Sequence, residues 1–283
     1  MSATKPPDRD TTRKRPDLSA QRTRVTSGAT ELTPVDIDAA YDACEQITRA
    51  QAHSFYRAIE PQSAYRRRAL CAIYAFARRV RDVADGTLPP ADKLHLLAEA
   101  RAGIPRGDGP RPVDPVLMAL RDVNRRFRLP LGSLDDLIDG AESDVYGVTN
   151  DTFDDGVRYC RQVAGSIGRL SVTVLGSRDP VAAAQLADDL GVAIELTKRL
   201  RELVEGSENG RTYLPRDTIR DLARRNRTWY DRGLPLLALL DARGAACVVT
   251  MTGIHRRELD RIERSADEAW ASGSSLAGAR VAR

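Results

Sequence analysis

Apolar residues recur at helical spacing along most of this chain, and no stretch shows the alternation of β-branched residues that indicates a strand. The segment from Ala72 to Gly86 is the clearest case, because it has no internal Gly or Pro and is rich in Ala and Arg. Its apolar positions, which share one face at about 100° per residue, are Ile73, Phe76, Ala77, Val80 and Ala84. The pattern predicts a helix that ends at Gly86.

The same segment carries a second face that is polar. Its members are Tyr74, Arg78, Arg81, Asp82 and Asp85. Two interpretations stay open for this face. It is either a solvated surface with i,i+4 ion pairs, Arg78 with Asp82 and Arg81 with Asp85, or part of a site that handles charge beside an apolar core.

A second helical segment, from Gly191 to Gly206, also combines acids with cations, and it leads into Arg211-Thr-Tyr-Leu-Pro215. Further helices are predicted over about 34–52, 65–86, 91–101, 115–127, 131–145, 216–226, 228–242 and 244–271. The Gly- and Pro-rich stretch 103–115 is predicted to be a loop within one domain. The chain is therefore expected to be all-α, with one helical domain over 34–271 and a flexible tail over 272–283.

Residues 1–33 are polar and mixed in charge, and we expect them to form a disordered basic tail. Residues 1–30 hold seven Lys or Arg and three Asp, so the whole net charge of +4 lies there. The tail is either a solubilising extension or a tether to an anionic surface. Because the folded part has no net charge and no recognised binding motif, a nucleic-acid binder is the weaker interpretation. The four cysteines have no metal-ligand spacing, which favours a reduced, cytoplasmic setting.

Gly165 and Gly168 stand inside a segment that is otherwise helical. Each glycine costs about 1 kcal/mol relative to Ala in a helix, so a packing reason is expected. Either another helix approaches closely on this face, or a flat apolar ligand lies against it.

Taken together, these segments resemble the squalene/phytoene synthase family. The first helix resembles the family pattern Tyr-x-Phe-x-Arg-x-x-Asp-Asp-x-x-Asp, and the second resembles Gln-x-x-Asn-x-x-Arg-Asp-x-x-x-Asp followed by Gly-Arg-x-Tyr-Leu-Pro. Two shorter segments, Ser54-Phe-Tyr56 and Tyr159-Cys-Arg-Gln-Val-Ala-Gly165, also match. The resemblance spans about residues 36–264 and is greatest to actinobacterial presqualene diphosphate synthases of hopanoid pathways, with phytoene synthase next. It implies a single-domain isoprenoid synthase bundle around a central apolar cavity.

The resemblance also implies a reaction. Two allylic prenyl diphosphates, farnesyl or geranylgeranyl, are joined head to head, as in presqualene diphosphate, squalene or phytoene synthesis within hopanoid or carotenoid biosynthesis. It implies catalytic roles for Tyr74, Arg78, Tyr159 and Arg201, with Tyr159 pointing into the reaction cavity. The implied substrate-binding residues are Ser54, Phe55, Arg78, Arg81, Lys198, Arg201, Arg211 and Tyr213.

The chain departs from the family pattern at the acids. Arg81 replaces the leading Asp of the first motif. In the second motif the replacements are Glu195 for Gln, Lys198 for Asn, Glu202 for the first Asp and Gly206 for the last Asp, with Glu205 beside that Gly. The implied Mg²⁺ ligands are then Asp82, Asp85, Glu202 and Glu205, and we expect fewer ions than is usual for the family. NADPH is not expected, because no Gly-x-Gly-x-x-Gly fingerprint is present.

Two functional hypotheses follow. In the first, the chain is an active prenyltransferase in which Arg81 and Lys198 partly replace Mg²⁺ as countercharges for diphosphate. In the second, the chain kept the fold and binds a prenyl diphosphate or a protein partner without the original turnover. No apolar run is long enough to cross a membrane, so peripheral contact with the inner face of the membrane is the only membrane role we expect. The oligomeric state stays open.

Overall fold

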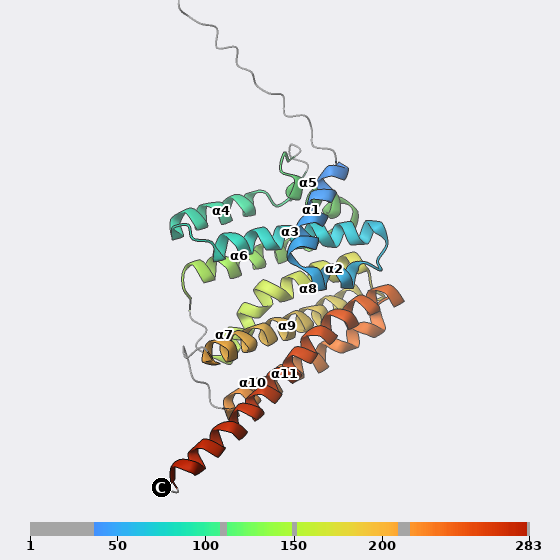
Figure 1. Ribbon diagram of the computed structural model, residues 1–283. Helices are drawn as coiled ribbons and strands as arrows, with labels where there is room; N and C mark the ends of the chain where they lie inside the picture. The colour runs from blue at the N-terminus through green and yellow to red at the C-terminus, as the bar shows by residue number, and fades with distance from the viewer. Residues whose placement is uncertain (1–36, 108–111, 149–151, 209–215, 282–283) are drawn as a thin grey trace, which may run out of the picture. The chain divides into compact units, whose positions relative to one another are not determined.

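The computed structural model describes residues 37–107, 112–148, 152–208 and 216–281, with side chains described to residue 205 and again over 218–264 in the last two ranges. All the described residues belong to one compact unit. All regular structure in the described ranges is helical (Figure 1). The α-helices are α1 (Ile37–Gln51), α2 (His53–Ile59), α3 (Ala64–Asp85), α4 (Pro90–Ala102), α5 (Pro115–Phe127), α6 (Gly132–Val145), α7 (Phe153–Cys160), α8 (Ser166–Leu175), α9 (Pro180–Glu208), α10 (Arg216–Gly233) and α11 (Ala242–Val281).

Local sequence explains where several helices begin. Ser63 precedes α3 and accepts the backbone N–H of Arg66, and Asp114 does the same for Leu117 at the start of α5. Thr152 and Asp155 form a reciprocal capping box on α7. α3 ends at Asp85 as predicted, although Gly86 is in an extended rather than a left-handed conformation.

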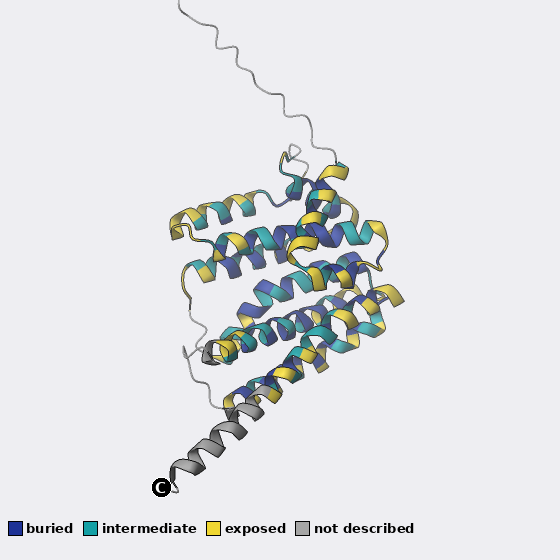
Figure 2. Cartoon of the chain, viewed as in Figure 1, coloured by how far each residue is buried: buried dark blue, intermediate teal, exposed yellow. Residues whose placement is uncertain are grey.

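α3 is the helix that the first half of the domain packs around. It buries ten residues and contacts α1, α5, α6 and α8. α9 plays the same part in the second half, where it contacts α7, α8, α10 and α11. In Figure 1, α8 lies between α3 and α9, and Figure 2 shows the buried faces of these helices turned toward each other. The bundle therefore has its apolar interior where α3, α8 and α9 meet.

Gly165 and Gly168 lie at the contact of α8 with α9. A Cβ added to Gly168 would lie under 3.0 Å from the backbone carbonyl of Ala187, and one added to Gly165 would overlap the carboxylate of Asp188. Gly191 on α9 makes the reciprocal approach to the backbone of Ala164. The close helix packing that the sequence offered as one alternative is therefore present, and Gly168 and Gly191 also line an apolar cavity, so the ligand alternative stays open. A π-helical turn, Arg161–Gly165, joins α7 to α8 at this point.

Two predicted boundaries were wrong. The break expected near residue 227 is absent, because α10 runs to Gly233 and a 3₁₀ turn, Leu234–Leu239, follows it. Thr228, where a new helix was predicted to begin, instead donates its hydroxyl to the backbone carbonyl of Arg225 within α10. The structure also continues α11 to Val281, past residue 271, where the last helix was predicted to end. The predicted disorder of residues 1–33 lies outside the described residues.

Candidate active site

An apolar cavity of about 460 Å³ lies among α2, α3, α8, α9 and α11. Its walls include Leu70, Ile167, Leu190, Ile194 and Val248. Among the described residues that line it, Lys198 alone carries a permanent charge. The cavity falls within the size range of sites for small organic ligands, about 300–1,000 Å³. It therefore offers an apolar chain a dry environment and offers an anion a single cationic contact.

Three predicted substrate-binding residues, Ser54, Phe55 and Lys198, line this cavity. Tyr74, predicted to be catalytic, lines it too, and its ring stacks on that of Phe55 with the centroids 5.4 Å apart. His53 lies beside them. The Ser-Phe-Tyr segment of α2 and the start of the first motif therefore meet in space, as the resemblance implied.

The acids of α3 are held by the cations one turn before them. The Arg78 guanidinium lies 2.7 Å from the Asp82 carboxylate, and Arg81 Nε lies 3.0 Å from Asp85 Oδ2. The i,i+4 ion pairs expected of a solvated helix surface are therefore present. They do not exclude a site, because Arg81 makes further contacts away from its own helix.

Arg81 reaches from α3 to α6 and α7. Its Nη1 donates to the Tyr159 hydroxyl at 3.1 Å and lies 3.7 Å from Asp144 Oδ2. The Tyr159 hydroxyl in turn donates to Asp144 at 2.6 Å. Burial and this hydrogen bond raise the pKa of Tyr159 to about 12, so the phenol keeps its proton at neutral pH. Tyr159 is buried but is not among the residues that line the apolar cavity; its hydroxyl ends in this polar network instead.

Glu195 on α9 is the anion that faces these cations. It is only 8% exposed, and its carboxylate lies 3.3 Å from Lys198 Nζ. Burial alone would raise the pKa of Glu195, but the charges of Lys198 and Arg81, with that of Arg199, outweigh it and lower the pKa. Glu195 is therefore ionised at neutral pH. The Arg199 guanidinium itself stacks 4.0 Å above the Tyr159 ring.

Arg201 turns toward α11. Its Nη1 lies 3.1 Å from Glu258, and its Nε lies 3.6 Å from Glu205 on its own helix. Glu258 also lies 3.6 Å from Nδ1 of His255, which lines the apolar cavity. Burial, followed by the charge of Lys198, lowers the pKa of His255, so this imidazole is neutral at pH 7. The second motif is thus joined to α11 by ion pairs.

The four carboxylates expected to hold Mg²⁺ do not come together as a metal site in the structure. No group of three His, Cys, Asp or Glu with metal-binding geometry occurs in the described ranges. Asp82 and Asp85 are each paired with an Arg, and Glu205 is paired with Arg201. The Arg81 guanidinium repels a divalent cation and cannot ligate one. The described residues therefore do not fit the magnesium centre that the family resemblance implies.

Arg211 and Tyr213, predicted to bind substrate, lie outside the described residues. The structure adds residues that the sequence prediction missed: Asp144, Arg199, His255 and Glu258. For Arg199 a signal was present, because it follows Glu195 by four positions on one helix. For Asp144 and Glu258 there was none, since both come from other helices.

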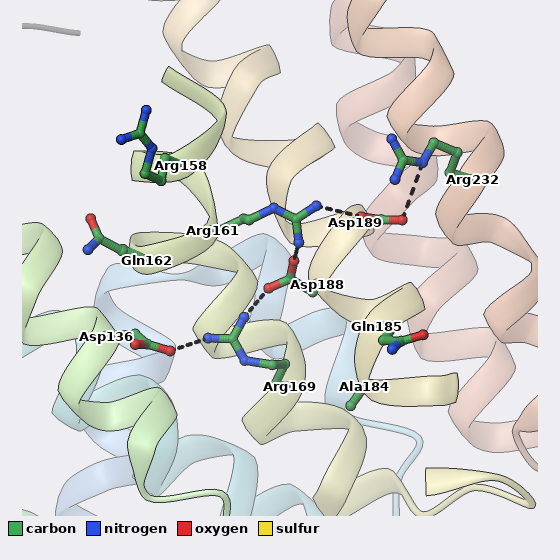
Figure 3. A pocket seen from close by; sticks show the side chains of 10 residues that line it. All are labelled: Asp136, Arg158, Arg161, Gln162, Arg169, Ala184, Gln185, Asp188, Asp189 and Arg232. Atoms are coloured by element: carbon green, nitrogen blue, oxygen red, sulfur yellow. Dashed lines mark hydrogen bonds and ion pairs between the residues drawn. The ribbon is translucent and has the colours of Figure 1, made fainter. Parts of the chain in front are cut away.

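A second hollow, of about 620 Å³, lies on another side of the α8–α9 pair (Figure 3). Asp188 is buried there between the guanidinium groups of Arg161 and Arg169. Arg161 and Arg232 also pair with Asp189, and Arg169 with Asp136 at 2.6 Å. Figure 3 shows these dashed contacts as one chain of alternating charges that ties α6, α8, α9 and α10 together. We refer to this hollow as the ion-pair pocket.

An all-helical bundle with an apolar cavity and charged residues at one end is the architecture of isoprenoid synthases. In agreement, the fold matches a crystal structure of a dehydrosqualene synthase in complex with a ligand, with a TM-score of 0.69 at 21% identity over 83% of this chain and 98% of the other. It also matches squalene synthase HpnC from Alicyclobacillus acidocaldarius, with a TM-score of 0.69 at 23% identity over 83% and 97%.

The sequence comparison narrows the class. The family model for squalene/phytoene synthase matches residues 48–220. Phytoene synthase from Mycobacterium tuberculosis is 37% identical over 276 residues, covering 88% of this chain and 90% of the relative. Phytoene synthase from Arthrospira platensis is 32% identical over 66% and 64% of the two chains. The chain belongs to the squalene/phytoene synthase family, whose members are prenyltransferases of isoprenoid biosynthesis, and the predicted family is confirmed.

In the described part of the chain, no helix is both long and apolar enough to cross a lipid bilayer.

Proposed function

We propose that this chain is a prenyltransferase that joins two allylic prenyl diphosphates head to head. The observation that carries the proposal is the apolar cavity with Lys198 as its one permanently charged lining residue in the described ranges. A prenyl diphosphate has matching chemistry, since its hydrocarbon tail favours the walls and its diphosphate favours the cation. Family membership supports the same reaction type.

The first step is heterolysis of a carbon–oxygen bond. The electron pair leaves with the diphosphate, which carries about three negative charges and must be stabilised by preorganised positive groups. Lys198 and Arg81, with Arg78 and Arg201 nearby along the two motif helices, are the groups that this chain supplies. The double bond of the second substrate then attacks the allylic cation, and loss of a proton closes a cyclopropane ring.

The residues of α2 and α3 act on the hydrocarbon. Phe55 and Tyr74 stack where the cavity wall meets the first motif, so their π-faces are suited to lie against the allylic cation. Ser54 offers a hydroxyl to the diphosphate. Tyr159, protonated and held by Asp144, is assigned the positioning of Arg81 rather than proton transfer.

Farnesyl and geranylgeranyl diphosphate are the proposed substrates, and the product is presqualene diphosphate or phytoene, within hopanoid or carotenoid biosynthesis, since neither product needs a reductant. We also propose that the chain works in the cytoplasm and collects these lipid-like substrates by peripheral contact with the membrane. Their tails partition into bilayers by the same apolar burial that the cavity offers.

A second candidate function is binding of a prenyl diphosphate without turnover. The observation that favours it is the engagement of Asp82 and Asp85 by Arg78 and Arg81, which leaves no metal centre among the described carboxylates.

One experiment separates the two functions. Purified protein is incubated with farnesyl or geranylgeranyl diphosphate, in Mg²⁺ and in EDTA, and products are identified by mass spectrometry. A head-to-head hydrocarbon or cyclopropyl diphosphate supports the prenyltransferase. Unchanged substrate, together with retained binding in a parallel titration, supports the second function and rejects the first.

A further inference from the structure

Two departures from the family pattern meet in the structure. Arg81 stands on α3 where the pattern has Asp, and Glu195 stands on α9 where the pattern has Gln. Arg81 Nη1 donates to the Tyr159 hydroxyl at 3.1 Å, and the Arg199 guanidinium lies 4.0 Å above the ring of the same tyrosine. Glu195, one turn before Arg199 on α9, lies 3.3 Å from Lys198 Nζ, and the charges of Lys198 and Arg81 both lower its pKa. A cation gained on one helix is thus matched by a buried anion gained on the other.

Near Glu195, the cationic side chains outnumber this one buried anion. Arg81, Lys198 and Arg199 all act on Glu195. Arg81 is also balanced by Asp85 and Asp144. Lys198 lies 3.3 Å from the Glu195 carboxylate. Arg199 stacks on the Tyr159 ring, and its buried Nε has no hydrogen-bond acceptor in the described part of the chain. A buried guanidinium N–H without an acceptor is costly, so an anionic ligand at this position is favoured.

A divalent cation at the same place meets the opposite situation. A fixed guanidinium repels a cation placed beside it, and the repulsion doubles when that cation is divalent. The carboxylates of α3 that could offset this repulsion are already bound to Arg78 and Arg81. The site is therefore electrostatically suited to phosphate oxygens and unsuited to Mg²⁺.

We propose that this chain binds the diphosphate of its prenyl substrate without a divalent ion, through Arg81, Lys198 and Arg199 as a permanent cationic cluster organised by Glu195. The guanidinium groups offer paired N–H donors that match phosphate oxygens, and Lys198 adds a point charge on the wall of the apolar cavity. This inference rests on the proposed prenyl diphosphate ligand, but not on turnover.

The test is direct binding. Farnesyl thiodiphosphate, in which sulfur replaces the bridging oxygen and slows ionisation, is titrated calorimetrically in Mg²⁺ and in EDTA. We expect dissociation constants within about threefold of each other, because the countercharge is part of the protein. A loss of affinity of about tenfold or more in EDTA overturns the inference, since a missing metal contact has at least that effect.

Two variants at one position sharpen the test. Arg81→Gln removes the charge without adding a ligand, and we expect weaker binding that stays independent of Mg²⁺. Arg81→Asp, combined with Glu195→Gln, restores the family residues, and we expect binding to become Mg²⁺-dependent. If the double variant stays indifferent to Mg²⁺, position 81 does not control the metal requirement and the inference fails. Circular dichroism and thermal unfolding show whether each variant is folded.

The outcomes also separate this inference from the proposed function. Metal-independent binding without any head-to-head product contradicts the proposed prenyltransferase function and supports the cationic binding site. Product formation with binding that requires Mg²⁺ supports the prenyltransferase function and contradicts the metal-independent site. Arg224→Gln, on an exposed part of α10, is the control for loss of one positive charge.

Discussion

The apolar cavity and the ion-pair pocket share one wall, but their charged residues are paired differently. Gly168 and Ala187 line the apolar cavity, while their chain neighbours Arg169 and Asp188 line the ion-pair pocket. In the ion-pair pocket every lining Arg has a carboxylate partner, with Arg158 bound to Asp155. At the cavity, Lys198 has Glu195 as its carboxylate partner at 3.3 Å, and the charge of Arg199, farther along α9, acts on the same carboxylate.

The difference separates a structural network from a binding site. Matched charges in the ion-pair pocket join four helices, and an added anion would have to displace an existing partner. Shared charges at the cavity leave donor capacity for a ligand. The larger hollow, with more charged residues, is therefore the less suitable one for substrate.

Breaking the ion-pair pocket should have the largest effect. Asp188→Asn leaves Arg161 and Arg169 without their shared buried carboxylate. We expect the free energy of unfolding to fall by about 2–3 kcal/mol, less than for a fully buried pair because both Args keep other partners and partial exposure. Urea denaturation measures this change.

Asp136→Asn is the matched control, since Asp136 also binds Arg169 but is 46% exposed. Its expected loss is under about 1 kcal/mol. Equal losses in the two variants would mean that burial does not distinguish the ion pairs. Affinity for farnesyl thiodiphosphate should change in neither variant.

The wall between the hollows can be tested next. Gly168→Ala places a methyl group against the backbone carbonyl of Ala187, which cannot move aside as a side chain would. We expect a loss of about 1–3 kcal/mol in the free energy of unfolding.

Gly156→Ala is the control, because that glycine lies in α7 with open space around it. Replacement there should stabilise the protein by about 0.5–1 kcal/mol. Opposite signs for the two variants, measured by thermal unfolding, would establish that α8 and α9 need close contact; a neutral Gly168→Ala would refute it.

The cavity should respond in binding rather than in stability. Lys198→Met removes the one permanently charged group that lines it in the described ranges. We expect affinity for farnesyl thiodiphosphate to fall by about 10- to 100-fold, which corresponds to a charged hydrogen bond of about 1.5–3 kcal/mol. Unchanged affinity would mean that the diphosphate does not bind at Lys198.

The smallest expected effect is a pH dependence. Burial and the charge of Lys198 lower the pKa of His255 below its usual 6.5, so the unfolded chain takes up this proton more readily than the folded one. The stability that neutral His255 contributes is present above pH 6.5 and is lost as the pH falls through the lowered pKa. Denaturation curves between pH 7 and about 5 should show this loss, and His255→Gln should flatten it. A parallel loss in the variant would assign the effect to other groups.

Much of the bundle could be predicted from local sequence. The Ala- and Arg-rich pattern of α3, the apolar periodicity of α9 and the loop at 103–115 all depend on neighbours in the chain, so their residues carry the signal. The break predicted near residue 227 failed because a polar stretch of α10 is held in helix by packing on α9 and α11. Gly165 and Gly168 indicated a close approach on their face of the helix, but the sequence did not identify the group that approaches.

The features of the candidate site also divide into those that the sequence could predict and those that it could not. Sequence alone determined the charged faces of α3 and α9, the i,i+4 pairs and the replacement of Asp by Arg81, because these follow from spacing on single helices. Tertiary structure decided that Arg81 meets Tyr159 and Asp144, that Glu195 is the buried anion between the cations, and that Asp188 belongs to a different hollow from Ala187. Those relations depend on how separate helices pack, and a charge has no partner until that packing brings one within a few ångströms.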